Sequence, residues 1–183
     1  FASDSNPTDP VSNVNDKLIS FNDRPANRWT NWNRTNPEAS VGVLFGDSGI
    51  LSKRSVDNLS VGFHEDHGVG APKSYVIEYY VGKTVPTAPK NPSFVGEENH
   101  AFNDPANWKE VSNLKAPAQL KAGEMNHFSF DKVETYAVRI RMVRLDSKKG
   151  TSITEVQIFA KQVAAAKQGK TRIQVDGKDL GNF

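Results

Sequence analysis

The sequence predicts an all-β protein, an antiparallel β-sandwich that spans residues 16–162. Short segments alternate apolar with polar residues at a period of two, which is the pattern of strands with one buried face. Gly, Pro, Asn and Asp separate these segments, and such spacing favours a sandwich over a parallel α/β sheet. No stretch carries the pattern of an amphipathic helix of useful length.

Six segments carry the strand pattern. In one of them Val138, Ile140 and Met142 alternate with Arg139 and Arg141, so one face is apolar and the other charged. The other segments show the same alternation with β-branched and aromatic residues. We expect strands at 41–47, 57–63, 74–81, 126–130, 135–143 and 153–159.

The two ends of the chain differ from this pattern. Residues 1–15 are rich in Ser, Asn, Asp and Pro, which predicts a tail or linker. Residues 163–183 begin with the small and polar VAAAKQGK and end in an alternating segment that turns at Asp176-Gly177. We expect a linker and the start of a next module there. Since the chain begins at Phe1, we also expect it to be part of a longer protein.

Composition excludes several classes of function. Charged residues make up 24% of the 183 residues and the net charge is only +2, so nothing favours nucleic-acid binding by a basic surface. There is no cysteine, which excludes disulfides and thiolate metal sites. Within these residues we find no apolar run long enough to span a membrane and no pattern of a signal peptide, so neither is expected here.

Polar, titratable residues follow one predicted strand directly. The strand with Leu59, Val61 and Phe63 runs into His64-Glu65-Asp66-His67, and then into a Gly/Pro-rich segment. Neighbouring side chains of an extended segment point to opposite sides, so these four converge on a metal only if the loop turns tightly. A metal site, a ligand-binding loop and a solvated turn all remain open on this evidence.

The order of several motifs resembles the galactose-binding-like, or discoidin (coagulation factor type C), family over about 145 residues. The similarity is greatest to the carbohydrate-binding modules of a large Gram-positive cell-surface β-galactosidase. The ending is its most specific part, where a strand with two arginines precedes a last strand that carries a Glu. The motifs are RWTNW at 28–32, LSVGF at 59–63, PKSYVIEYYVG at 72–82, TYAVRIRMV at 135–143 and GTSITEVQIF at 150–159.

The resemblance implies a jelly-roll sandwich whose ligand site lies in loops at one end. Carboxylates and imidazoles suit sugar hydroxyls, and an aromatic ring suits the apolar face of galactose. Trp29 is expected in the core, whereas Trp32 is expected to stack on the sugar. The predicted ligand-binding residues are Trp32, Asn33, Arg34, His64, Glu65, Asp66, His67 and Lys148.

The resemblance also implies a structural Ca²⁺ held by the first long loop and Glu155. The matching loop reads SFNDRPANRW, in which Arg24 replaces a residue of the usual acidic pattern. Calcium takes six to eight oxygen ligands, and Asp23, Asn27 and Glu155 are the candidates. The alternative is that Arg24 or Arg28 pairs with Glu155 in place of the ion.

The sequence therefore predicts a non-catalytic module that binds terminal galactose, in glycans of the lactose or N-acetyllactosamine type. We expect a monomer that works with other modules of the same extracellular, cell-wall-attached polypeptide. A β-galactosidase is the expected parent, and adhesion to host glycans is a second expected role. The alternative is a discoidin-like domain that docks on a protein or a membrane; polar loop tips argue against membrane insertion.

Overall fold

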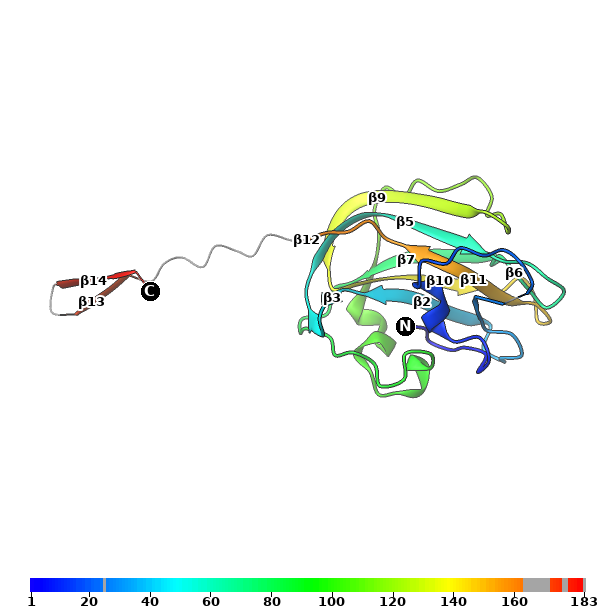
Figure 1. Ribbon diagram of the computed structural model, residues 1–183, viewed down its shortest axis with the longest axis horizontal. Helices are drawn as coiled ribbons and strands as arrows, with labels where there is room; N and C mark the ends of the chain where they lie inside the picture. Colours follow the sequence, from blue (N-terminus) through cyan, green and yellow to red (C-terminus); the bar gives the residue numbers. More distant parts are fainter. Residues whose placement is uncertain (25, 163–171, 176–177, 183) are drawn as a thin grey trace.

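Two antiparallel sheets form the body of the protein in a computed structural model, which describes residues 1–24, 26–162, 172–175 and 178–182 (Figure 1). The sandwich predicted from the alternation is confirmed, and every expected strand is present. Among the described residues, no helix is long and apolar enough to span a membrane.

The larger sheet has six strands, in the order β1-β11-β5-β12, with β9 on the other side of β5 and β6 beside β11. All its pairings are antiparallel except that of β6 with β11. Its strands are β1 (Trp29–Thr30), β5 (Arg54–Phe63), β6 (Val69–Gly70), β9 (Met125–Thr135), β11 (Gly150–Gln157) and β12 (Lys161–Gln162).

The smaller sheet has four strands, in the order β2-β10-β7-β8. Two further pairs lie outside both sheets, β3 with β4 and β13 with β14. The strands are β2 (Glu38–Leu44), β3 (Gly46–Asp47), β4 (Ile50–Leu51), β7 (Ser74–Tyr80), β8 (Trp108–Glu110), β10 (Ala137–Val143), β13 (Arg172–Val175) and β14 (Lys178–Asn182). The predicted linker at 163–171 and the turn at 176–177 lie outside the described residues.

The core forms where the apolar faces of the two sheets meet. Val61 and Phe63 of β5 face Val138 and Ile140 of β10 in one cluster, as the period-two alternation requires. Trp29 is fully buried in the same cluster, as the sequence predicts.

The charged face of β10 points away from this core and is covered by the 82–108 segment. Arg139 pairs with Glu78 of β7 at 2.7 Å, and its guanidinium carbon lies 4.0 Å from the centre of the Trp108 ring. Trp108 and Phe102 form a second apolar cluster around it. The segment contains the short 3₁₀ turns η2 (Val95–Glu97), η3 (Ala101–Asn103) and η4 (Pro105–Asn107).

The N-terminal segment is packed, which corrects the expectation of a tail over residues 1–15. Ala2 forms an antiparallel bridge with Val41 of β2, and the 3₁₀ turn η1 (Val11–Val14) buries Val11 and Val14 in the core. The buried Trp29 indole donates a hydrogen bond to the Ser5 hydroxyl at 2.8 Å. Ser, Asn and Asp residues, whose polar composition suggested a linker, form hydrogen bonds of this kind with the rest of the fold.

We predict that Val14→Ala destabilises the fold, because it removes buried methyl groups from the core. The free energy of unfolding should fall by about 1 to 3 kcal/mol, measured by denaturant unfolding. Ser12→Ala, on the exposed side of the same turn, is the matched control and should change it by less than about 0.5 kcal/mol. Equal stability of the two variants would mean that the segment does not contribute to the core.

Candidate functional site

A pocket of about 460 Å³ lies at the end of the sandwich where β5 ends and β11 begins. Figure 1 shows these strand ends on the right. Three parts of the chain form the pocket: the N-terminal segment, the stretch that leads into and past β1, and the loop between β5 and β6. Its lining residues are Thr8, Asp9, Asp23, Arg24, Arg28, Thr30, Trp32, Asp66, His67, Gly68 and Val69.

Asp66 is fixed by the turn that follows β5. Its Oδ1 accepts hydrogen bonds from the backbone N–H groups of Gly68 at 2.7 Å and Val69 at 3.0 Å, which leaves Oδ2 facing Arg28 at 3.3 Å. Burial acts to raise the pKa of Asp66, but these two N–H donors and the Arg28 charge outweigh it and lower the pKa below its ordinary value. Asp66 therefore presents an anion to the pocket.

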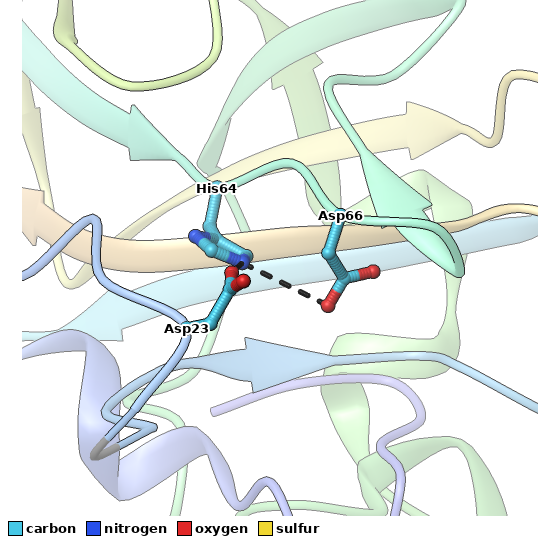
Figure 2. A group of neighbouring side chains, drawn as sticks. All are labelled: Asp23, His64 and Asp66. Atoms are coloured by element: carbon cyan, nitrogen blue, oxygen red, sulfur yellow. Dashed lines mark ion pairs between the residues drawn. The ribbon is translucent and has the colours of Figure 1, made fainter.

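His64 lies beneath the pocket and is only 2% exposed. Its Nε2 lies 3.1 Å from Asp23 Oδ1 and 3.8 Å from Asp66 Oδ2, so that an imidazole and two carboxylates point to one place (Figure 2). His64 and Asp66 are two residues apart, which puts both side chains on the same side of an extended segment. Glu65 points away and pairs with Lys149 at 3.4 Å.

Trp32 forms the exposed apolar wall of the pocket, with 45% of the residue accessible. The edge of its indole lies against Gly68, where an added Cβ would come within 2.8 Å of Nε1. Its carbonyl accepts a hydrogen bond from the Asn6 side chain at 3.1 Å. An aromatic face is thus held next to the Asp66 turn.

The structure brings three of the eight predicted ligand-binding residues to the pocket lining: Trp32, Asp66 and His67. Arg34 instead pairs with Asp4 at 2.7 Å and Glu97 at 3.2 Å. His64 lies below the lining, and the remaining three are outside it. These are Asn33, exposed with a φ of 58°, Glu65, and Lys148 in the turn before β11.

Sequence reasoning missed the contributions of Arg28, Thr30, Thr8 and Asp9. Thr30 donates a hydrogen bond to Asp9 at 2.7 Å, which ties the N-terminal segment to β1. Nothing in the local pattern indicates this contact, because residues 9 and 30 meet only once Val11 and Val14 are packed in the core.

The family model of the β-galactosidase-like (BgaA-like) galactose-binding domain matches residues 1–156, which is most of the chain. The chain belongs to this family. It is therefore a carbohydrate-binding module associated with a β-galactosidase, and as such a binding domain rather than a catalytic one. No curated protein is similar enough to count as a match.

Solved structures agree with this assignment of the BgaA-like domain. A structure of the Streptococcus pneumoniae β-galactosidase BgaA is 90% identical, with a TM-score of 0.86, and the match covers 88% of this chain and 90% of that one. The family 32 module of Clostridium perfringens NanJ, solved in complex with galactose, shares the fold at 15% identity. Its TM-score is 0.55, with 86% of this chain and 90% of that one covered.

The chitosan-binding module 1 of a Paenibacillus chitosanase/glucanase shares the fold in the same way. It is 16% identical with a TM-score of 0.54, and the match covers 87% of this chain and 92% of that one. The β-sandwich of this BgaA-like domain is thus the scaffold of several carbohydrate-binding modules.

Glu155 lies in a separate polar cluster of the BgaA-like domain, on β11. It is 2% exposed, and its Oε2 has no hydrogen-bond partner among the described residues. Burial and the nearby charge of Asp16 raise the pKa of Glu155 from 4.5 to about 7, although the backbone N–H groups of Lys17 and Asp16 act to lower it.

The acid beside Glu155 is therefore Asp16, which corrects the expectation of Asp23. Asn27 joins this cluster, since its Nδ2 donates to Asp16 Oδ2 at 3.0 Å and to the Leu18 carbonyl at 3.3 Å. Asp23, in the same loop, lies against His64 instead. Carboxylate, amide and carbonyl oxygens are the donors that Ca²⁺ takes, so this cluster fits the ion.

The alternative of an arginine that pairs with Glu155 has no support in the described part of the chain. Arg28 pairs with Asp66, and Arg24 lines the pocket.

We predict that Gly68→Ala displaces the Trp32 ring, because the new Cβ would overlap its Nε1. The indole N–H resonance of Trp32 should shift in an NMR spectrum, while those of Trp29 and Trp108 stay in place. Gly70→Ala is the matched control in the same loop, since a Cβ there meets nothing closer than 3.8 Å. A Trp32 resonance unchanged by Gly68→Ala would contradict the packing of the Trp32 indole against Gly68.

Proposed function

We propose that the pocket lined by Trp32 and Asp66 binds terminal galactose, in glycans of the lactose or N-acetyllactosamine type. The observation that carries the proposal is an exposed indole held beside an anionic carboxylate and the exposed His67 in one pocket. The indole would stack on the apolar C–H face that the axial O4 leaves on galactose. Asp66, His67 and Arg28 would take the hydroxyls, since they offer both donors and acceptors.

This site would act by preformed stacking and hydrogen bonding, with no chemical step. Its contacts are few, so we expect a modest affinity, with a Kd of roughly 10⁻³ to 10⁻⁵ M. The module would hold its parent glycosidase close to galactose-terminated glycans outside the cell, where the parent is attached to the cell wall. Adhesion to host glycans would follow from the same binding, with further modules of the polypeptide adding avidity.

We predict that Trp32→Ala nearly abolishes galactose binding in calorimetry, because stacking supplies a large share of a small total free energy of binding. Asp66→Ala should weaken binding by about 1 to 3 kcal/mol, the effect of leaving a polar ligand group without its partner. Wild type should bind galactose better than glucose, whose equatorial O4 leaves the same protein groups unpaired.

The control for Trp32→Ala is Phe159→Ala, which removes an aromatic side chain that is 70% exposed but does not line the pocket. It should leave galactose binding unchanged. If folded Trp32→Ala protein binds galactose as wild type does, the stacking role is wrong. Equal affinity for the two sugars would contradict galactose as the ligand.

We also propose that Glu155, Asp16 and Asn27 hold a structural Ca²⁺. Glu155 is buried and Asp16 beside it is exposed, and their negative charges repel unless a proton or a cation lies between them. Burial is the main cause of the raised pKa of Glu155, and the negative charge of Asp16 adds to it. The ion would fix the loop that carries Asp23, Arg24 and Arg28 to the pocket.

The pH dependence of stability tests the ion. With chelator present, Glu155 is protonated in the folded protein up to a pH of about 7 but only to about 4.5 when unfolded. The folded state then binds the extra proton, so its stability falls as the pH rises from about 4.5 through 7. We predict that Ca²⁺ raises the melting temperature by several degrees at pH 8 and by much less at pH 5.

Glu155→Gln is the variant that separates the ion from other causes. It removes the charge that calcium neutralises, so its melting temperature should be insensitive to both chelator and Ca²⁺. In chelator at pH 8 it should be at least as stable as wild type. A wild-type melting temperature that does not respond to Ca²⁺ at pH 8 would show that the cluster holds no ion.

A further inference from the structure

We propose that His64, Asp23 and Asp66 form a second metal site of a different kind, which takes a divalent first-row transition-metal ion such as Zn²⁺. Each residue offers one ligand atom, and the three atoms lie within 4.8 Å of one another. The residues come from two loops, one before β1 and one after β5, and their side chains converge in Figure 2.

The buried imidazole is the observation that points to a ligand. His64 Nε2 is shielded from solvent and has no well-aligned hydrogen bond among the described residues, even though a carboxylate oxygen lies 3.1 Å away. Leaving a buried polar atom without a hydrogen bond costs about 1 to 3 kcal/mol. A metal ion between the nitrogen and the two carboxylates would satisfy it.

The spacing of the three atoms suits four-coordinate zinc. Ligands about 2.1 Å from a tetrahedral ion lie about 3.4 Å from each other. The His64 nitrogen lies 3.1 Å from Asp23 and 3.8 Å from Asp66, which brackets this value. Side-chain rotation at Asp23, which is 76% exposed, suffices to adjust the geometry.

Charge also favours a divalent ion here. Asp23 and Asp66 bring two carboxylates to the cluster, and Arg28 supplies one positive charge at 3.3 Å from Asp66 Oδ2. A carboxylate oxygen can accept a hydrogen bond from a guanidinium and still ligate a metal, and such partners commonly orient metal ligands. Arg28 therefore holds Asp66 in position for the ion.

The donor set distinguishes this site from the cluster at Glu155. An imidazole nitrogen with carboxylates suits zinc and related ions, whereas calcium takes oxygen ligands. Three protein ligands leave a fourth position, as in sites where the metal also binds water or a substrate oxygen. Both aspartates line the pocket, so this fourth position would open towards it.

The test is a titration of the metal-free chain with Co²⁺ in excess Ca²⁺, which fills the all-oxygen site, and with no sugar present. We expect one equivalent of Co²⁺ to give visible absorption bands typical of four-coordination, and Zn²⁺ to abolish them. Because sugar is absent, the result does not depend on galactose binding.

Asp23→Asn should weaken Co²⁺ binding at least tenfold. Because Asp23 is exposed, this substitution should not disturb folding. Asp57→Asn, at an exposed acid of β5, is its control and should bind as wild type. His64→Gln should abolish the bands, while His127→Gln, at an exposed histidine of β9, should keep them. Absence of binding in wild type, or binding that survives both Asp23→Asn and His64→Gln, would overturn the proposal.

Discussion

The outer face of β11 is covered by protein rather than by water, and the site depends on this cover. The N-terminal segment, η1 and the loop before β1 lie over the strand, so that nearly all of Gly150–Gln157 is buried. Phe21 of this loop comes close to Gly62, on the neighbouring strand β5, where an added Cβ would lie 3.3 Å from its ring. The cover is tied down by core packing of Val11 and Val14 and by the hydrogen bond from Trp29 to Ser5. Polar side chains on β11 and at the end of β5 are therefore enclosed, whereas on an open sheet they would be solvated.

Because these polar groups are enclosed, the stability of the fold depends on whether each of them has a hydrogen-bond partner or an ion. Among the described residues, most buried side-chain atoms without a hydrogen bond belong to this layer: Arg28 Nε, His64 Nε2, Thr151 Oγ1, Ser152 Oγ and Glu155 Oε2. Each such atom opposes folding by about 1 to 3 kcal/mol if it stays unsatisfied. A group of them in one layer indicates a place that ions, water or a ligand complete, because natural folds rarely leave buried polar atoms unpaired. By contrast, the buried Arg139 donates hydrogen bonds to Glu78 and to the Phe102 carbonyl and lies over the Trp108 ring, and none of its atoms is among the unpaired ones.

The sandwich could be predicted from the sequence because the pattern that specifies each strand lies within the strand itself. Alternation in β5 and β10 decides which side chains face the core, and a one-residue slip would expose Phe63 or Ile140. The site could be predicted only in part, because its contacts join distant residues. Asp66 and His67 follow a strand directly and were found, and so was Trp32. Arg34 was expected at the pocket but is drawn to Asp4 and Glu97, both of them in segments whose course the sequence does not reveal. Asp16 was missed because it lies before the loop segment that the motif pattern points to, and its proximity to Glu155 appears only in the folded chain.

The loop before β1 contributes to both polar clusters. Asp16 and Asn27 lie by Glu155, while Asp23 and Arg24 reach the pocket. Ordering the loop loses conformational entropy of about 1 to 2 kcal/mol for each residue fixed. Contacts at Glu155 and contacts at the pocket both offset this loss of entropy. Loop residues that the Glu155 cluster already orders need not lose the same entropy again when a ligand fills the pocket. An ion at Glu155 would therefore preorganise Asp23 and Arg28 for whatever the pocket binds, and a ligand on Asp23 would in turn favour the ion. The two polar clusters on β11 and β5 differ in their donors, but they act on the same length of chain.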